Sequence, residues 1–401
     1  MAEGKPAINN HQLRAIIVCT MWPTVINYAS GMVARRVGRD MWLSGIISVL
    51  CTAIFLIIMV GIGRSFPGKT IVEYSQELLT TIPGKLVGFI LSVFFFVAAA
   101  NTVSMYIHHL TDFLLPETPF LVVTILHVGV VSFLILKGPE VIARMGVIGF
   151  SLAIVFYLLV FLASLSEVEF RRLLPFFESG FFSVSKASIS IDSFIGVNQI
   201  LIGMLLPMLA DDKKAYKASL SGLFIGGFFF VFYFIVELMV MGPQVVALMR
   251  IASMDFVRSI QITQYLHRFE SFMVGLWYWS MLVQAGILGY CSLKAMLQTL
   301  GIKKEKKRPV LTIGFGIGTI ALTYFIANDR ILFLNFRETS WQYFSMPIQY
   351  GLPIILLIAF MIRNLAGGGK KKTSEKTDAP KKPKSEEEKT VCENEADKQT
   401  A

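Results

Sequence analysis

The sequence predicts an all-α integral membrane protein with about ten membrane-spanning helices. Its mean hydropathy is +0.63, and only 16% of its residues are charged, against about 25% in soluble domains. It also contains 33 Phe residues, so too few polar side chains remain to cover a surface that faces water. Because lipid is the solvent that accepts such a surface, a soluble enzyme and a disordered protein are both excluded.

Ten apolar stretches reach the length of about 17 residues that a membrane-spanning helix requires. They are residues 13–33, 41–63, 84–107, 120–136, 141–165, 189–210, 219–241, 271–297, 310–327 and 341–362. Ten spans divide into two sets of five, and many transporters consist of two such repeats in inverted orientation. The division makes the first and the sixth helices counterparts of each other.

The segments between and beyond the spans suggest three regions. Residues 1–12 form a polar N-terminus without the apolar core of a cleaved signal peptide, and residues 13–363 form the membrane domain. Residues 64–83 read as an amphipathic cytoplasmic connector, and residues 243–270 as helices at the membrane interface. Residues 364–401 are rich in Lys, Glu and Pro, which predicts a disordered cytoplasmic tail.

The positive charges indicate the orientation of the chain. The formal net charge is +10, but lysines and acidic residues nearly balance in the tail, so the excess lies in short loops between apolar spans. That distribution is typical of membrane topology and does not point to nucleic acid. A basic cluster at 303–308 favours the cytoplasm, whereas Arg35, Arg36 and Arg39 oppose this orientation. We expect both termini in the cytoplasm.

The first and sixth spans, which are counterparts in the two repeats, both contain residues that break α-helices. In the first span Pro23 removes a backbone donor, and Thr24 follows it. In the sixth span Gly196, Asn198 and Gln199 stand among apolar residues. Broken helices at matching places of two repeats are where such transporters bind their substrates. A proline kink with ordinary interhelical hydrogen bonds is the alternative, but the matching positions favour a ligand cavity with helices 1 and 6 unwound around it.

Polar residues in other spans complete the candidate site. Each amide at membrane depth needs partners that lipid does not provide. Trp277 has two equally good interpretations, as part of a pocket or of an aromatic belt at the interface. The candidate ligand-binding residues are Thr24, Asn27, Gly196, Asn198, Gln199, Asn101, Trp277 and Gln284.

The remaining polar groups have structural interpretations. Glu237 lies near the outer end of its span, so we expect it to be solvated or in a salt bridge rather than to relay protons. Glu140 and Arg144 have the spacing of an ion pair within one helix. His108 and His109 lack further ligands at metal spacing. Without a phosphate-binding loop, a nucleophile elbow or paired acids, we expect no catalysis, no cofactor and no metal.

Several segments resemble endospore germination permeases, the B subunits of GerA-type germinant receptors. These are FPGKTIVEYSQELL at 66–79, GPEVIAR at 138–144 and YLHRFESF at 265–272, which leads to Trp277. The ungapped spacing from Thr20 to Asp40, Trp42 and Ser44 is also similar to that family. Together these segments extend over helices 1 to 8, in the right order.

This resemblance implies a fold and a function. The family belongs to the amino acid–polyamine–organocation superfamily, with the five-plus-five inverted repeat of LeuT-like transporters. Its members are located in the inner membrane of spores, bind nutrient germinants that are typically amino acids, and act with an A subunit and a lipoprotein C subunit. The resemblance therefore implies that a germinant binds between helices 1 and 6, with helices 3 and 8 closing the pocket.

The sequence departs from the family pattern near the expected pocket. Family members usually have glycine where this chain has Pro23 and Val25, and an acidic residue is common near the position of Asn198. Two other functions therefore stay open. One is a secondary transporter of amino acids or other small solutes, and the other is a scaffold subunit that binds no ligand.

Overall fold

The computed structural model describes residues 8–249, 251–259, 269–302 and 308–366. The chain divides into two units, Met1–Met361 and Ile362–Ala401. Of the second unit, only residues 362–366 are described, as the end of the last helix, so the predicted disordered tail falls almost entirely outside the described residues. The described residues form helices and no named strand; Ile8 and Leu209 make one isolated bridge.

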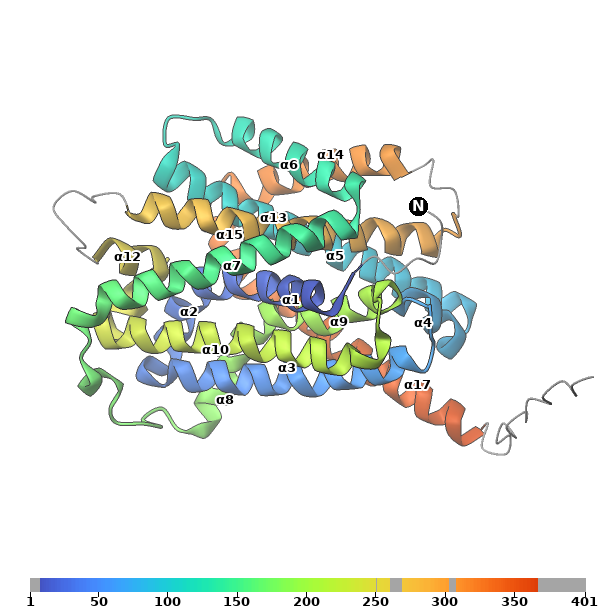
Figure 1. The fold of residues 1–401 in the computed structure, drawn as a ribbon, viewed down its shortest axis with the longest axis horizontal. Helices are drawn as coiled ribbons and strands as arrows, with labels where there is room; N and C mark the ends of the chain where they lie inside the picture. Colours follow the sequence, from blue (N-terminus) through green and yellow to red (C-terminus); the bar gives the residue numbers. More distant parts are fainter. Residues whose placement is uncertain (1–7, 250, 260–268, 303–307, 367–401) are drawn as a thin grey trace, which may run out of the picture. The chain divides into compact units, whose positions relative to one another are not determined.

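The first apolar run folds into two antiparallel passes. It consists of α1 (Asn10–Thr24), the π-helical turn η1 (Val25–Ala29), α2 (Ser30–Val37), η2 (Gly38–Asp40) and α3 (Met41–Arg64). Figure 1 shows the chain running out along α1 and α2 and returning along α3. The reversal occurs at Gly38, whose φ of +51° suits a residue without Cβ. Asp40 then accepts backbone N–H groups from Phe177 and Ser179 at 2.8 and 2.9 Å.

The predicted connector is helical over half of its length. In α4 (Ile71–Leu79), Thr70 and Glu73 form a capping box that satisfies the first free N–H groups. Next come α5 (Thr81–His109) with η3 (Leu110–Leu114), α6 (Phe120–Lys137) and α7 (Pro139–Ser164). In α7, Arg144 Nη2 lies 2.6 Å from Glu140 Oε1, which confirms the predicted ion pair.

The sixth span is interrupted at a glycine. The helix α8 (Phe181–Ile195) ends before Gly196, and α9 (Val197–Leu205) begins directly after it, leading to η6 (Leu206–Met208). A Cβ at Gly196 would lie 2.6 Å from Gln349 Oε1, so the glycine permits a close approach of the tenth span. Both predicted interruptions are therefore present, as a π-helical turn in helix 1 and a single-residue turn in helix 6.

The second half of the chain continues with α10 (Ala215–Met241) and two short helices, α11 (Pro243–Leu248) and α12 (Ala252–Ser259). Next are α13 (Phe269–Thr299) and α14 (Arg308–Ala327). The last pass is composed of α15 (Arg330–Asn335), η9 (Phe336–Ser340), α16 (Trp341–Met346), η10 (Pro347–Gly351) and α17 (Leu352–Ala366). It therefore begins eleven residues before the predicted start of this span at residue 341.

Nine helical stretches in the described residues are long and apolar enough to cross a membrane. The first of them, Asn10–Arg64, contains the reversal at Gly38 and makes two passes, which gives ten in total. Short 3-10 turns lie in the connections at Leu165–Glu167, Phe170–Leu173 and Asp212–Lys214. Within Met1–Met361, α1 packs against α7, α10 and α13, while α5 packs along α13. Helix 1 is thus enclosed by other helices.

Candidate functional site

A small cavity lies where five of the spans meet. Its volume is about 10 Å³, enough for roughly one water molecule. The helices around it are α1, α5, α13, the region of the break between α8 and α9, and the turn η9 with the start of α16. The lining residues are Thr24, Ala98, Asn101, Thr102, Phe194, Val197, Gln284, Leu288, Arg337 and Trp341. Three of the candidate residues, Thr24, Asn101 and Gln284, are therefore brought together.

Gln284 links α13 to the end of α1. The Thr24 hydroxyl lies 3.2 Å from Gln284 Oε1 and 3.1 Å from its Nε2. The same Nε2 donates to the backbone carbonyl of Thr20 at 3.0 Å. Gln284 thus bonds to both the side chain and the backbone of the last turn of α1, the helix that contains Pro23.

Asn198 joins the two interrupted helices behind the cavity lining. Its Oδ1 accepts a hydrogen bond from the Thr20 hydroxyl at 2.6 Å. Its Nδ2 donates to the carbonyl of Ile195 at 3.0 Å, across the break at Gly196. Asn198 does not line the cavity in this closed arrangement. Its amide instead holds α9 against α1, directly beside the Thr20 carbonyl that receives Gln284.

The other four candidates also lie outside the cavity lining. The Gln199 Nε2 donates to the Gln349 carbonyl, and Gly196 lies against the side chain of that same residue. Asn27 donates to the Pro23 carbonyl, while its Oδ1 lies 2.7 Å from His109 Nε2. Trp277 is buried, with its ring centroid 6.1 Å from that of His109.

Arg337 lines the cavity and was absent from the sequence-based candidates. It lies on η9, is only 2% exposed, and donates from Nη1 to Asn101 Oδ1 at 3.1 Å. Its Nε and Nη2 have no hydrogen-bond partner among the described residues. The guanidinium carbon lies 4.1 Å from the centre of the Tyr28 ring and 5.0 Å from that of Phe194.

These contacts offset only part of what it costs to bury Arg337. Each cation–π contact contributes about 0.5–2 kcal/mol, whereas burial of an ion costs several kcal/mol unless an opposite charge accompanies it. In the described part of the chain, no carboxylate forms an ion pair with Arg337. The cavity therefore contains a buried positive charge with free donors.

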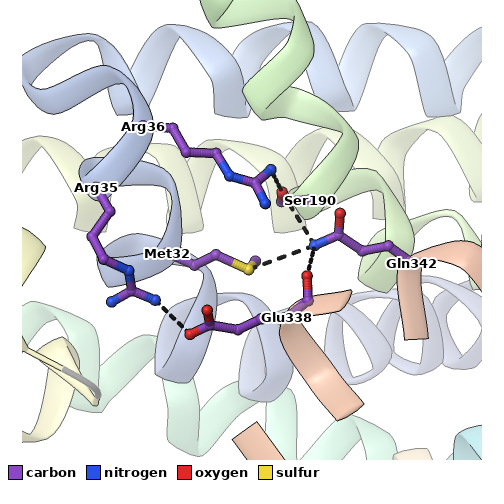
Figure 2. Close-up of polar contacts among 6 residues, drawn as sticks. All are labelled: Met32, Arg35, Arg36, Ser190, Glu338 and Gln342. Carbon is purple, nitrogen blue, oxygen red and sulfur yellow. Dashed lines mark hydrogen bonds and ion pairs between the residues drawn. The ribbon is translucent and has the colours of Figure 1, made fainter. Parts of the chain in front are cut away.

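A cluster of polar side chains joins helix 1 to helices 6 and 10 at the far end of α2. The Arg35 Nη2 lies 2.5 Å from Glu338 Oε1, and Arg36 Nη1 donates to Ser190 Oγ at 2.5 Å (Figure 2). Gln342 Nε2 donates to the Glu338 carbonyl at 2.7 Å and lies 3.3 Å from Ser190 Oγ. We call these residues, together with Met32, the α2-end cluster. It ties the three helices together on one side of the cavity.

A larger and more open cavity of about 470 Å³ lies beyond the aromatic residues next to Arg337. We call it the vestibule. Its lining includes the carboxyl groups of Asp112 and Asp255 and the guanidinium of Arg330, which pairs with Asp112. Tyr28 and Phe333 also line it. Since the same two rings contact Arg337, they form the partition between the vestibule and the central cavity.

Two acidic side chains, Glu237 and Asp192, are buried among the helices. Glu237 is fully buried, 3.4 Å from the Ser30 hydroxyl, and forms no ion pair with any described residue, so the expectation of a solvated or salt-bridged group was wrong. Packing of α10 against η1 and the short helices α11 and α12 excludes water there. Asp192, which the sequence analysis overlooked, accepts from the hydroxyls of Ser48 and Thr52 at 2.6 and 3.5 Å.

Comparison with known proteins identifies the family of this chain. A family model described as "Spore germination protein" matches residues 7–331, which is most of the chain. The spore germination protein YndE of Bacillus subtilis (strain 168) is 25% identical over 329 residues, covering 80% of this chain and 86% of that protein. The spore germination protein KB of the same strain is 23% identical over 373 residues, covering 88% and 94%.

The fold also matches a solved transporter. Mhp1, a nucleobase-cation-symport-1 family transporter solved in a closed conformation with bromovinylhydantoin bound, superimposes with a TM-score of 0.64. The alignment covers 91% of this chain and 82% of that one at 14% identity, so it establishes the fold alone. The prediction of an all-α membrane protein with the LeuT-like inverted repeat is confirmed. With ten helical passes, two interrupted helices around a polar cavity and a family match across most of its length, this chain is a multi-pass membrane protein of the spore germination protein family.

Proposed function

We propose that the protein is the B subunit of a spore germinant receptor and binds a small, amino acid-like nutrient in the central cavity. The observation that carries this proposal is the convergence of Thr24, Asn101 and Gln284 from three helices on one buried cavity at the helix 1 and helix 6 interruptions. Polar groups at that depth need partners, and a ligand that separates these helices can replace the hydrogen bonds they now make to neighbouring groups. Binding would then bias the conformation that A and C subunits in the spore inner membrane detect.

The small size of the cavity supports a mechanism in which binding and conformation are linked. A volume of about 10 Å³ is too small for any amino acid. A ligand must separate the helices in order to enter, and it can shift the balance between closed and open forms only by its different affinity for the two. Reversing a 1:99 balance to 99:1 takes roughly 5.5 kcal/mol.

A matched pair of threonine substitutions tests the proposal. The Thr24 hydroxyl bonds to Gln284 at the cavity, whereas the buried Thr124 hydroxyl bonds to the Phe120 carbonyl of its own helix at 2.8 Å. We expect Thr24→Val to raise the nutrient concentration for half-maximal germination by about three- to tenfold, the effect of one lost hydrogen bond. Thr124→Val should leave it unchanged. Germination of complemented deletion spores is measured by loss of optical density, with protein abundance checked by immunoblot.

Two results would contradict the proposal. If deletion spores respond normally to every nutrient in a broad panel, the protein is not required for nutrient sensing. If Thr24→Val and Thr124→Val behave alike at equal abundance, the cavity does not bind the nutrient. The protein would then be better described as a scaffold subunit that binds no ligand, the alternative suggested by Pro23 and Val25.

A secondary transporter is the second candidate, because the fold is that of Mhp1. Uptake of radiolabelled amino acids into proteoliposomes that contain the purified chain separates the two functions. Uptake that depends on a proton or sodium gradient would favour transport, whereas binding without uptake would favour the receptor.

A further inference from the structure

Arg337 lines the central cavity and has two donors without a described partner. Its Nη1 is engaged with Asn101 Oδ1 at 3.1 Å, but Nε and Nη2 have no partner among the described residues. Nε and Nη2 lie on one edge of the guanidinium plane, and two parallel N–H groups on one edge match the two oxygens of a carboxylate. The free edge therefore has the geometry for bidentate binding of a carboxylate.

The surroundings of Arg337 fix the guanidinium without neutralising it. The guanidinium carbon lies 4.1, 5.0 and 5.6 Å from the ring centres of Tyr28, Phe194 and Phe333. Aromatic rings hold a cation in place but supply no oxygen acceptor for its N–H groups. The side chain is thus held among aromatic rings and forms no ion pair with any described carboxylate.

The residue that follows Arg337 is directed to a different partner. The Glu338 carboxylate pairs with Arg35 in the α2-end cluster, and Gln342 donates to the Glu338 backbone carbonyl (Figure 2). These contacts hold the π-helical turn η9 in register, with residue 338 bonded to helix 1 and residue 337 in the cavity lining. Glu338, the acid nearest in sequence to Arg337, therefore forms its ion pair with Arg35 and not with Arg337.

Two aromatic residues of the vestibule also contact Arg337. Tyr28 and Phe333 contact the guanidinium and also line the vestibule of about 470 Å³. Movement of these two rings would open the central cavity to the vestibule. A solute in the vestibule would then meet Arg337 as the first unpaired charge in the cavity.

The geometry points to Arg337 as the residue that binds the carboxylate of a small organic acid, such as the α-carboxylate of an amino acid. This inference rests on the proposed function and deepens it by naming the ligand class and the residue that selects it. The carboxylate would complete the coordination of Nε and Nη2 and neutralise the buried cation. Thr24 and Gln284 would remain for the other polar part of the ligand.

Binding of matched acids and amides to the purified full-length chain in nanodiscs tests this inference. The probes are the proteinogenic L-amino acids and, for each that binds, the corresponding carboxamide, with affinity measured by isothermal titration calorimetry. Arg337→Met removes the charge and keeps an unbranched side chain. Arg337→Lys keeps the positive charge but loses the two parallel N–H groups of the guanidinium. Arg144→Met is the control. Arg144 belongs to an exposed ion pair on α7, outside the cavity lining.

We expect the free acid to bind at least about thirtyfold more tightly than its amide, because a buried charge pair is lost in the amide. Arg337→Met should weaken binding of the acid by a similar factor, Arg337→Lys should restore part of it, and Arg144→Met should have no effect. In the absence of ligand, Arg337→Met should unfold at the same temperature as the wild type or higher, since it removes an unpaired buried charge.

Equal affinity for acid and amide, or wild-type affinity in Arg337→Met, would overturn the inference and leave the proposed function intact. So would a clear loss of thermal stability in ligand-free Arg337→Met together with unchanged binding, which would make Arg337 a structural cation held by its aromatic neighbours. If no amino acid or amide binds the wild type, the proposed function and this inference both fail.

Discussion

Single buried polar side chains determine much of what this membrane domain can do. Sequence reasoning held that amides such as Asn198 and Gln199 must find partners where lipid has none. The structure provides part of those partners: the Thr20 hydroxyl donates to Asn198 and Gln199 Nε2 donates to the Gln349 carbonyl, while Gln199 Oε1 has no partner among the described residues. In Arg337, which carries a charge, two donors lack a described partner.

At this scale, Asp192 allows a clear prediction. Its carboxyl accepts from the hydroxyls of Ser48 and Thr52 and so ties α8 to α3. Asp192→Leu leaves both hydroxyls without that acceptor, and we expect a loss of about 1–3 kcal/mol in the free energy of unfolding. Asp192→Asn keeps an acceptor oxygen and should lose less than half as much. Thermal unfolding of the purified variants in detergent measures this difference, and equal losses would show that the carboxyl charge matters rather than the hydrogen bonds.

Among the helical elements, two π-helical turns meet at the site. The turn η1 carries Tyr28 and η9 carries Arg337, and the guanidinium carbon lies 4.1 Å from the centre of the Tyr28 ring. A π-helical turn inserts one residue into a helix and changes the direction of the side chains near it, and such turns are frequent at functional sites. Helices 1 and 10 thus contact each other through these two turns, at the partition between the vestibule and the cavity.

The helix α11 packs against α2, and a substitution at Gly31 tests this contact. A Cβ at Gly31 would lie 2.4 Å from the Met249 carbonyl oxygen, which belongs to backbone and cannot easily move away. We expect Gly31→Ala to destabilise the protein by about 1–3 kcal/mol through overpacking. Gly129→Ala, in a helical position with nothing within 4 Å of the new Cβ, is the control.

The control should be neutral or stabilising by about 0.5–1 kcal/mol, as expected for Gly→Ala in an open helical position. Fluorescence-detected thermal unfolding of both variants compares them directly. If Gly31→Ala is as stable as Gly129→Ala, the segment after α10 does not hold its position against α2.

For the whole molecule, the arrangement of passes predicts which loops face the cytoplasm. Ten passes with both termini inside place Lys213, after helix 6, in the cytoplasm and Glu178, before it, outside. Both side chains are exposed. In a variant whose four native cysteines are replaced by alanine, a membrane-impermeant maleimide should label Glu178→Cys on intact cells and label Lys213→Cys only after permeabilisation. The reverse pattern would invert the topology.

Truncation of the chain tests whether the predicted tail is dispensable. Residues 367–401 carry nearly balanced charge and few apolar residues, so they cannot bury enough surface to fold alone. We expect a chain ending at residue 366 to accumulate to the wild-type level and to respond to nutrient at the same concentration. A fall in abundance on an immunoblot would instead make the tail a docking element for a partner.

The sequence by itself determined the class of protein, the number of passes, the two interruptions and the family. These follow from local properties: apolar runs of sufficient length, Pro23 and Gly196 as helix breakers, and short segments with a family pattern. It also indicated three of the residues that line the cavity, because polar groups within apolar spans are expensive wherever they lie.

Only the tertiary structure decided which polar groups face the cavity and which pack between helices. Asn198 and Thr24 have the same sequence signature, yet one bonds across two helices and the other lines the cavity. Arg337 was missed because its charged neighbours lowered the local hydropathy, so the last span was predicted to begin at residue 341. The helix continues through this segment because the Arg35–Glu338 pair, Asn101 and three aromatic rings hold Glu338 and Arg337, and these partners come from distant parts of the chain, although Nε and Nη2 of Arg337 stay without a described partner.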